Sequence, residues 1–336
     1  MLRRGRHLPR SAAPSPGAAT FFPPSASEAR MTSIAPLPRL VVFGEALTDF
    51  VRTGEASWRS VAGGACWNVA RVAATLGLPT GWGGAVSEDF LGREIVDKSR
   101  EAGLDLRFLQ VVARPPLVAM VHELSPPRYF FLGEGAADLA FDAARLPAGW
   151  EAACEFAHFG CISLVRQPLG AQLVALAQRL HAAGVPLSFD PNCRNLMGAD
   201  YPPLFERMAA LARVVKLSDE DLRHVYPSLP ADQALARVRG LAPQAVLLYT
   251  RGGEGMSVHP PGGAGFEQPA FAVPVADTVG AGDACVGGFL ASLLARPDAG
   301  LAGHARFAAA TAAVACTRAG AYAPTRAEVE ALLASA

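Results

Sequence analysis

Residues 277–290 read DTVGAGDACVGGFL, a turn of small residues that runs directly into an apolar helix pattern. Gly280, Ala281 and Gly282 form the turn, and Asp283 opens the predicted amphipathic helix. A helix start offers free backbone N–H groups and a partial positive charge, which together favour an anion such as a phosphoryl group. Glycines keep side chains away from those amides. The stretch therefore predicts an anion site with a carboxylate at its edge.

Asp283 has two interpretations at this point. A carboxylate beside a phosphoryl site can accept the proton of an attacking hydroxyl, as a general base does. An aspartate at a helix start is also a common N-cap, which is a purely structural role. Two other phosphate motifs are excluded, because the sequence has no G-x-x-x-x-G-K-[ST] and the G-x-G at 280–282 lacks the third glycine of a dinucleotide fingerprint.

The composition is that of a globular enzyme-sized chain. Its 336 residues are 51% apolar and 18% charged, enough for one large α/β domain or two ordinary ones. The 30 basic and 30 acidic side chains balance, and no basic stripe follows the first segment, so no nucleic-acid partner is expected. No apolar run reaches the roughly 18 residues of a membrane span. Six scattered cysteines without a C-x-x-C pair predict reduced thiols and a cytoplasmic protein.

Residues 1–37 are predicted to be a disordered N-terminal extension. Residues 1–30 carry five arginines, repeated proline and serine, and one acid, Glu28, with no hydrophobic periodicity. An organelle transit peptide is also rich in arginine and serine, although the prolines argue against an amphipathic targeting helix. A third alternative is that translation starts at Met31.

The rest of the chain, 38–336, predicts an α/β fold with a central, mostly parallel sheet flanked by helices on both faces. A small β-sheet is expected from about 50–62 and 106–132, where short β-rich pieces are broken by proline. Strands of the main sheet are predicted at 40–45, 80–86, 156–160, 186–190, 213–217 and 245–250. Helices are predicted at 66–76, 89–102, 170–183, 202–212, 231–240, 282–295, 301–318 and 325–334.

Two segments carry a family resemblance. Residues 277–283 resemble the second signature of the PfkB, or ribokinase-like, carbohydrate kinases, D-T-x-G-A-G-D. Residues 63–95, GGACWNVARVAATLGLPTGWGGAVSEDFLGREI, resemble their first signature, and the order of the two agrees with the family. The resemblance runs from about Leu40 to Ala334. It implies a ribokinase-like fold with a small β lid, and phosphoryl transfer from MgATP to a sugar hydroxyl.

The resemblance assigns roles to individual residues of this chain. It implies that Asp283 is the catalytic base, with Gly280, Ala281 and Gly282 as the anion hole. The implied sugar contacts are Asp49, Gly63, Gly64 and Asn68. Without the family, Asp49 is equally well explained as a solvated loop acid, and Asn68 as an amide on a helix surface. Asp and Asn supply the fixed acceptors and donors that a sugar needs.

Three further segments resemble fructokinases within the family: HFGCISL (158–164), FDPNCR (189–194) and KLSDEDL (216–222). FDPNCR ends a predicted strand, where ligand-facing loops of open parallel sheets lie. Asp190, Asn192 and Arg194 are therefore expected to face the sugar or the phosphates; the alternative is a capped turn after the strand.

KLSDEDL resembles the family's N-x-x-E stretch, with Ser218 and Asp221 where Asn and Glu are usual. Either Glu220 or Asp221 is expected to hold the waters of Mg²⁺, and the sequence leaves the choice open. TRGGEG at 250–255 resembles the turn under the nucleotide, or is simply a glycine hairpin. The implied cofactors are ATP and Mg²⁺, and the sequence leaves open whether a monovalent cation such as K⁺ is also required. The residues expected around the nucleotide are Lys216, Ser218, Thr250, Gly252, Gly253, Gly255 and Thr278.

Two positions depart from the pattern. Fructokinases often carry an arginine before the Ala137–Asp138 pair, where this chain has Gly133, and Ala309 stands at a frequent asparagine. Because three segments still resemble fructokinases, fructose is the first expected acceptor. The alternatives are 2-keto-3-deoxygluconate, ribose, another ketose or a nucleoside. A regulator that binds nucleotide and sugar without catalysis, and a structural α/β protein, are alternatives of other classes. The expected partners are a sugar, ATP and a second copy paired through the lid.

Overall fold

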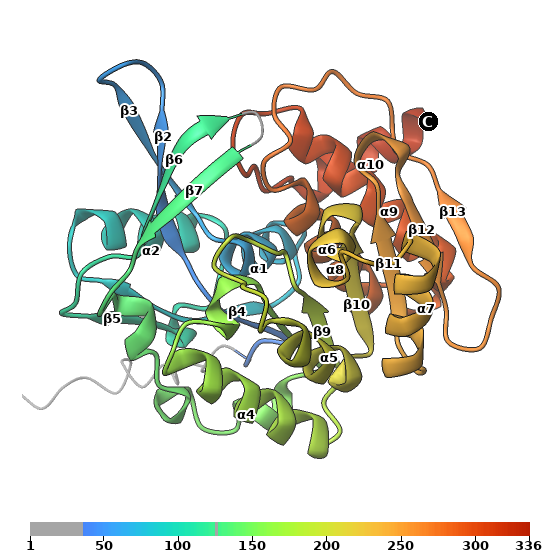
Figure 1. Ribbon diagram of the computed structural model, residues 1–336, viewed down its shortest axis with the longest axis horizontal. Coiled ribbons are helices and arrows are strands. Elements are labelled where there is room, and N and C mark those ends of the chain that lie inside the picture. Colours follow the sequence, from blue (N-terminus) through green and yellow to red (C-terminus); the bar gives the residue numbers. More distant parts are fainter. Residues whose placement is uncertain (1–35, 125–126) are drawn as a thin grey trace, which may run out of the picture. The chain divides into compact units, whose positions relative to one another are not determined.

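The computed structural model describes residues 36–124 and 127–336. The predicted disordered extension lies outside these residues, apart from its last two positions. Two sheets occur in the described part of the chain (Figure 1). The large sheet has the order β13-β12-β11-β10-β9-β8-β1-β4-β5. Its strands are β1 (Leu40–Phe43), β4 (Thr80–Ser87), β5 (Leu109–Val112), β8 (Phe156–Gly160), β9 (Leu187–Asp190), β10 (Val214–Ser218), β11 (Val246–Thr250), β12 (Met256–His259) and β13 (Phe266–Gln268).

The predicted mostly parallel sheet with helices on both faces is confirmed. Within the large sheet all neighbouring strands pair in parallel, except that β12 pairs antiparallel with β11 and with β13. The α-helices of the described residues are α1 (Ala65–Thr75), α2 (Phe90–Glu101), α3 (Trp150–Ala153), α4 (Leu169–Ala182), α5 (Pro202–Leu211), α6 (Asp219–Val225), α7 (Ala231–Leu241), α8 (Ala281–Ala295), α9 (Gly300–Cys316) and α10 (Arg326–Ser335).

Strand β1 shows why the sheet must be covered twice. Val41 and Phe43 belong to a core that includes side chains of α4 and α5, whereas Leu40 and Val42 belong to a second core with α1, α8 and α9. Successive side chains of a strand point to opposite faces, so an uninterrupted apolar run is stable only with helices on both sides. The run LVVF therefore determines the layer arrangement.

Helix α8 lies at the predicted position but is not amphipathic. Residues 283–292 are buried on all sides, because α8 packs between α1 and α9. Gly287 and Gly288 allow this approach, since a Cβ at Gly287 would meet Val72 at 2.8 Å and one at Gly288 would meet Thr311 at 2.6 Å. The helix that carries Asp283 is thus a central element of the core.

The small sheet contains β2 (Leu47–Arg52), β3 (Trp58–Gly63), β6 (Val118–Leu124) and β7 (Pro127–Leu132), in the order β3-β2-β6-β7. Figure 1 shows these strands as a group separate from the large sheet. One part of the expected small sheet is wrong: β5 pairs with β4 at the edge of the large sheet. Its short apolar pattern fits either sheet, and pairing with β4 decides between them.

The carboxyl ends of the parallel strands collect the polar segments of the motifs. Glu45 follows β1, Asp190 ends β9, Lys216 lies near the end of β10, and Thr250 ends β11. Ligands of open α/β sheets bind at this edge. Within the described residues, no helix has the length and apolar character that crossing a membrane requires. All six cysteines have free thiols.

Candidate active site

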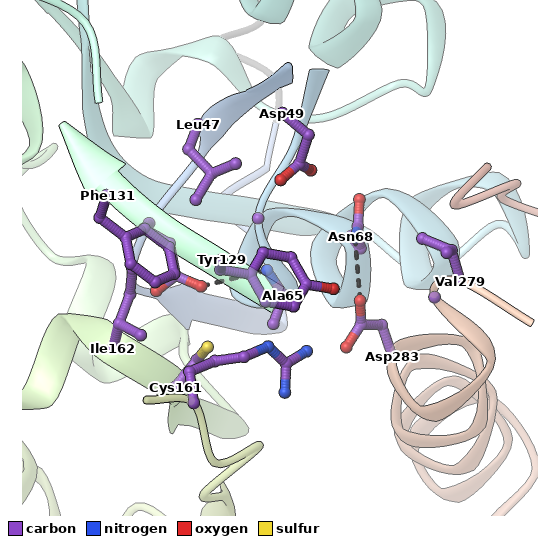
Figure 2. A pocket seen from close by; sticks show the side chains of 14 residues that line it. Leu47, Asp49, Ala65, Asn68, Tyr129, Phe131, Cys161, Ile162, Val279 and Asp283 are labelled. Carbon is purple, nitrogen blue, oxygen red and sulfur yellow. Dashed lines mark hydrogen bonds between the residues drawn. The ribbon is translucent and has the colours of Figure 1, made fainter. Parts of the chain in front are cut away.

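A pocket lies between the small sheet and the start of α8 (Figure 2). Four predicted residues of the sugar and base sites line it: Asp49, Gly64, Asn68 and Asp283. Arg194 and Gly280 line it as well. The two signature segments therefore meet in space, although they are far apart in the chain. The remaining lining residues, which were not predicted as site residues, are Glu45, Leu47, Ala65, Tyr129, Phe131, Cys161, Ile162 and Val279.

Asp283 is not an N-cap. The N-cap of α8 is Gly280, and the Asp283 carboxylate binds side chains of other elements. The amide of Asn68, on α1, donates to Oδ2 of Asp283 at 2.9 Å, as Figure 2 shows. The amide of Asn192 donates to Oδ1 at 3.2 Å. Each carboxylate oxygen thus has one fixed donor and keeps acceptor capacity for a further hydrogen.

The Asp283 carboxylate is 6% exposed, and burial raises its pKa above the ordinary value. The Asn68 hydrogen bond and the positive charges of Arg194 and Lys216 offset part of that rise. A raised pKa makes the ionised carboxylate a stronger base than that of an exposed aspartate. Position and basicity therefore both suit proton abstraction.

Asp49 faces the pocket from β2 and lacks a partner. No described residue donates a hydrogen bond to its carboxylate, and burial raises its pKa to about 7. Arg194 lowers this pKa, whereas the negative charges of Asp283 and Glu45 raise it. Asp49 is half-buried, and a carboxylate that is partly withdrawn from water without a protein donor is costly, unless a ligand supplies the donors. The alternative of a solvated loop acid is not supported for Asp49.

Gly63 and Gly64 shape the pocket by lacking side chains. A Cβ at Gly63 would lie 2.5 Å from Oδ2 of Asp49. Gly64 has φ +115°, a conformation that residues with a Cβ rarely adopt, and its Cβ would meet the Glu45 carbonyl at 2.7 Å. The glycine pair therefore makes room for Asp49 and permits the tight entry into α1.

Glu45 is a pocket residue that the sequence reasoning missed. It is 1% exposed, accepts the Ala65 N–H at 3.1 Å through Oε1, and accepts the Ser163 hydroxyl through Oε2. Burial raises its pKa. The position of Glu45 just after a buried parallel strand could have identified it, because ligands of open α/β sheets bind at the carboxyl ends of the strands.

The small sheet contributes an apolar wall. Tyr129 and Phe131 on β7 stack with ring centroids 6.2 Å apart, and Leu47 on β2 lines the same pocket. Arg194 adds a cation: its guanidinium lies 5.8 Å from the Tyr129 ring and donates to the carbonyl of Cys193 at 2.8 Å. Apolar rings beside acceptor groups match the mixed faces of a sugar.

Asp190 and Asn192, the other two residues of the 189–194 segment that were expected to face a ligand, do not line this pocket. Asp190 accepts the backbone N–H of Asn192 at 3.0 Å, which is the capped turn that the sequence left as an alternative. Asn192 adopts φ 38°, in the left-handed region. Its side chain nevertheless reaches Asp283, so the turn has a contact with the site as well as a local role.

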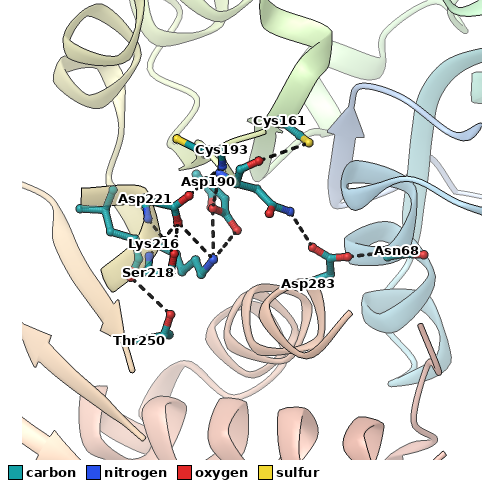
Figure 3. A network of polar contacts seen from close by, with 12 residues as sticks. Asn68, Cys161, Asp190, Cys193, Lys216, Ser218, Asp221, Thr250 and Asp283 are labelled. Atoms are coloured by element: carbon teal, nitrogen blue, oxygen red, sulfur yellow. Dashed lines mark hydrogen bonds and ion pairs between the residues drawn. The ribbon is translucent and has the colours of Figure 1, made fainter. Parts of the chain in front are cut away.

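Lys216 lies behind the glycine turn of α8, and Figure 3 shows its contacts. Its ammonium is 3.1 Å from Asp190 Oδ2 and 3.8 Å from Asp221 Oδ2. Burial alone would lower the Lys216 pKa, but the two carboxylates raise it overall, so the group is a cation at neutral pH. A Cβ at Gly282 would lie 3.2 Å from this ammonium. The positive charge thus lies next to the amides of the predicted anion hole.

Glu220 and Asp221 differ in their surroundings. Asp221 is 3% exposed and accepts hydrogen bonds from the Cys193 N–H at 2.7 Å and from the N–H and hydroxyl of Ser218, both at 2.7 Å. Glu220 is exposed on α6. No group of three or more His, Cys, Asp or Glu side chains suited to a metal ion occurs in the described residues. The polar network therefore includes Asp221 and not Glu220.

Two of the residues expected around the nucleotide, Lys216 and Ser218, belong to this network. The Thr250 hydroxyl donates to the Leu217 carbonyl at 3.3 Å (Figure 3). Gly252, Gly253 and Gly255 form the exposed turn between β11 and β12, and Gly255 has φ +89°. The Thr278 carbonyl accepts the Ala281 N–H at 3.2 Å, which closes the turn before α8. No described contact among these residues tests the nucleotide role.

The departure at Gly133 has a structural reason. A Cβ at Gly133 would lie 2.6 Å from Nη1 of Arg166 and 2.5 Å from Leu117. The Arg166 guanidinium donates to the Gly133 carbonyl at 2.7 Å and pairs with Asp138 at 2.7 Å. An arginine from the segment before α4 therefore occupies this space, so a side chain at 133 would require Arg166 and Leu117 to move.

Comparisons with known proteins agree with this arrangement. The pfkB family carbohydrate kinase profile matches residues 37–328. A fructokinase of Rhizobium leguminosarum bv. trifolii is 35% identical over 74% of this chain and 78% of its own length. A fructokinase of Xylella fastidiosa, solved with bound ATP, has a TM-score of 0.80 at 30% identity, covering 89% of this chain and 99% of that one.

A fructokinase of Vibrio cholerae O395, solved with fructose, ADP and calcium ion, has a TM-score of 0.77 at 26% identity. The match covers 88% of this chain and 99% of that one. Fold, family profile and relatives thus agree on the family. The chain belongs to the pfkB family of carbohydrate kinases and is a fructokinase-like sugar kinase.

Proposed function

We propose that this chain transfers the γ-phosphoryl group of ATP to a primary hydroxyl of fructose, with Asp283 as the base. The observation that carries the proposal is a buried carboxylate, held by two amides, at the meeting point of a polar pocket and a helix start. Fructokinases among the relatives support the choice of fructose.

The sugar side rests on unsatisfied groups. Asp49 has no donor among the described residues, and Oδ1 of Asn68 is buried without a hydrogen-bond partner. Sugar hydroxyls can supply donors to both acceptors, which recovers the cost of burying them. Tyr129, Phe131 and Leu47 can then contact the C–H face of the sugar.

The phosphoryl side rests on the start of α8. The first N–H groups of a helix lack acceptors within the helix, and the macrodipole adds positive character. In the predicted anion hole at 280–282 the Ala281 N–H already donates to the Thr278 carbonyl, so the N–H groups of Gly280 and Gly282 are the ones without an acceptor among the described residues, and Lys216 lies alongside. Charge that develops on the transferring group would be stabilised there, which is the main contribution in phosphoryl transfer.

The step balances with Asp283 alone as the proton acceptor. The sugar hydroxyl gives its proton to the Asp283 carboxylate while its oxygen forms a bond to the γ-phosphorus. The bond between that phosphorus and the β–γ bridging oxygen breaks, and ADP leaves. Closing the small sheet over the pocket would exclude water and limit ATP hydrolysis.

Asp221 fits an indirect role toward Mg²⁺. Its oxygens already accept three hydrogen bonds, so we propose that Asp221 binds water molecules of the ion and not the ion directly. We do not assign this role to Glu220, which is exposed on α6. Mg²⁺ keeps several waters when it binds phosphates, and it supplies neutralisation of their charge. A K⁺ requirement is tested by activity in potassium-free buffer with and without added KCl.

The remaining parts of the proposal concern assembly and compartment. We assign a homodimer paired through the small sheet, because β3 and β7 are its unpaired edge strands within the described residues. Sedimentation of the purified chain measures this directly, and a monomer at all concentrations rejects it. We assign the cytoplasm because all six cysteines are free.

The test is Asp283→Asn, assayed with fructose and ATP by coupled detection of ADP. We expect turnover to fall by about 10²-fold or more, as loss of a general base predicts. Asp232→Asn, which changes an exposed acid on α7, is the matched control and should keep full turnover. Near-full turnover of Asp283→Asn rejects the role.

An acceptor panel of fructose, ribose, 2-keto-3-deoxygluconate and a nucleoside ranks the alternative substrates. Binding of sugar and ATP without any ADP release indicates a regulator that lacks catalysis.

A further inference from the structure

The catalytic carboxylate is oriented from two sides by neutral amides. Asn68 holds Oδ2 from α1, and Asn192 holds Oδ1 from the loop after β9. An amide fixes direction without neutralising the charge, whereas a cation in direct contact would lower the basicity of the carboxylate. With two donors from separate elements, rotation of the carboxylate about its Cβ–Cγ bond is restricted at both oxygens.

Asn192 makes this contact only in an unusual backbone conformation. Its φ is 38°, a left-handed value that non-glycine residues adopt infrequently and that asparagine tolerates best. Such residues persist when their surroundings hold them in place, and they cluster at functional sites. What holds Asn192 therefore also determines the position of its amide.

Both backbone groups of Asn192 are held. Its N–H donates to Asp190 Oδ1 at 3.0 Å. Its carbonyl accepts from Arg194 Nη1 at 3.2 Å and from the Cys161 thiol at 3.6 Å. The Asp190 and Arg194 contacts are both charge-assisted, and the Asp190 contact is the shorter of the two.

Asp190 is in turn fixed by Lys216. The ammonium lies 3.1 Å from Oδ2 and 3.3 Å from Oδ1, and the side chains of Lys216 and Asp190 are 5% and 3% exposed. They come from neighbouring strands, β9 and β10, in the centre of the large sheet. The contacts from Lys216 through Asp190 and Asn192 to Asp283 are therefore continuous, and Figure 3 labels Lys216, Asp190 and Asp283.

We propose that Asn192 is a positioning residue for the Asp283 carboxylate, and that the buried Lys216–Asp190 ion pair holds Asn192 in the conformation that this contact requires. The proposal rests on Asp283 being the base, and it assigns Asn192 to the base and not to the sugar. It also gives the ion pair a role in turnover that is separate from the position of Lys216 beside the predicted anion hole.

The first variant is Asn192→Gly, which removes the amide and keeps a backbone that accepts positive φ. We expect kcat to fall by about 10- to 100-fold, because a mobile base is misplaced for attack. The KM values for fructose and ATP should stay within about threefold, since no ground-state contact is removed. Unfolding temperature measured in parallel separates this effect from loss of folded protein.

The pH profile supplies a readout that a structural role would not move. Losing a donor to the ionised carboxylate raises the pKa of Asp283, so the acid limb of kcat/KM should move upward by about half a unit to one unit. The charged groups around Asp283 that also act on this limb are Glu45, Asp49, Asp190, Arg194 and Lys216. Asn195→Gly, an exposed asparagine of the same loop, is the matched control and should leave the limb in place.

The second variant is Asp190→Asn, which keeps an acceptor for the Asn192 N–H but removes the charge that Lys216 binds. We expect kcat to fall by about 3- to 10-fold in the parent and by less than about twofold in the Asn192→Gly background, because effects within one pathway are not additive. Equal effects of Asp190→Asn in both backgrounds overturn the role of the ion pair. Unchanged kcat and acid limb in Asn192→Gly, with Asp283→Asn inactive, overturn the positioning role and leave the proposed base intact. An active Asp283→Asn rejects the base itself.

Discussion

Replacing Asp49 by asparagine should make the protein more stable at pH 8 and impair sugar binding. The Asp49 carboxylate is mostly buried, accepts no hydrogen bond from a described residue, and lies near the negative charges of Asp283 and Glu45. Ionising it in the folded state therefore costs free energy. Asparagine has nearly the same shape and carries no charge, so Asp49→Asn removes that cost.

The magnitude follows from the pKa. Burial raises the pKa of Asp49 from 3.8 to about 7. A shift of about three units corresponds to about 4 kcal/mol, at roughly 1.4 kcal/mol per unit. Between these two pKa values the unfolded chain has lost the proton and the folded protein has kept it, so the stability of the parent falls as pH rises from about 4 to about 7. The variant lacks this fall.

The assay is urea unfolding of the parent and Asp49→Asn at pH 4.5 and pH 8, without ligands. We expect the variant to gain about 2 to 4 kcal/mol relative to the parent between these pH values. Asp232→Asn on α7 should show no such gain. A constant difference between Asp49→Asn and the parent at both pH values would refute the reasoning. The KM for fructose should rise by about tenfold or more in the variant, since an acceptor in the pocket is weakened.

Two further substitutions test the glycines of the site. Gly63→Ala places a Cβ 2.5 Å from Asp49 Oδ2, so the carboxylate must move. In steady-state kinetics the KM for fructose should rise about tenfold, while kcat stays within about threefold of the parent value. A fall in kcat alone would contradict this reasoning. Gly133→Arg should lower the unfolding free energy by about 1 to 3 kcal/mol, because Arg166 occupies that space. Adding Arg166→Ala should restore most of the lost unfolding free energy, since the new arginine at position 133 can take over the contact with Asp138. If chemical denaturation shows no such recovery, competition with Arg166 is not the cause.

Much of the fold could be predicted because its signals are local. The run LVVF in β1 is apolar at every position, which requires cover on both faces of the sheet. The pair of signature segments identified Asp283 and Asn68, and the structure joins them by a hydrogen bond at 2.9 Å. A glycine turn followed by an acid is readable from sequence because helix starts have fixed chemistry.

The functions of several polar residues depended on contacts that sequence cannot specify. The sequence assigned Asn192 to a ligand, whereas its amide lies against Asp283. Glu45 received no role and lines the pocket. Both outcomes depend on which strand ends lie side by side in the large sheet, and strand order is set by non-local pairing.

A doubly covered parallel sheet, a glycine-lined helix start and an acid at its edge could all be predicted from local patterns, since periodicity and glycine content act within a few residues. Three features required the folded chain: residues 109–112 pair with β4, Arg166 occupies the space beside Gly133, and Lys216 lies next to the α8 turn. These outcomes depend on packing between segments distant in the chain, where burial and charge pairing select among arrangements that are locally equivalent.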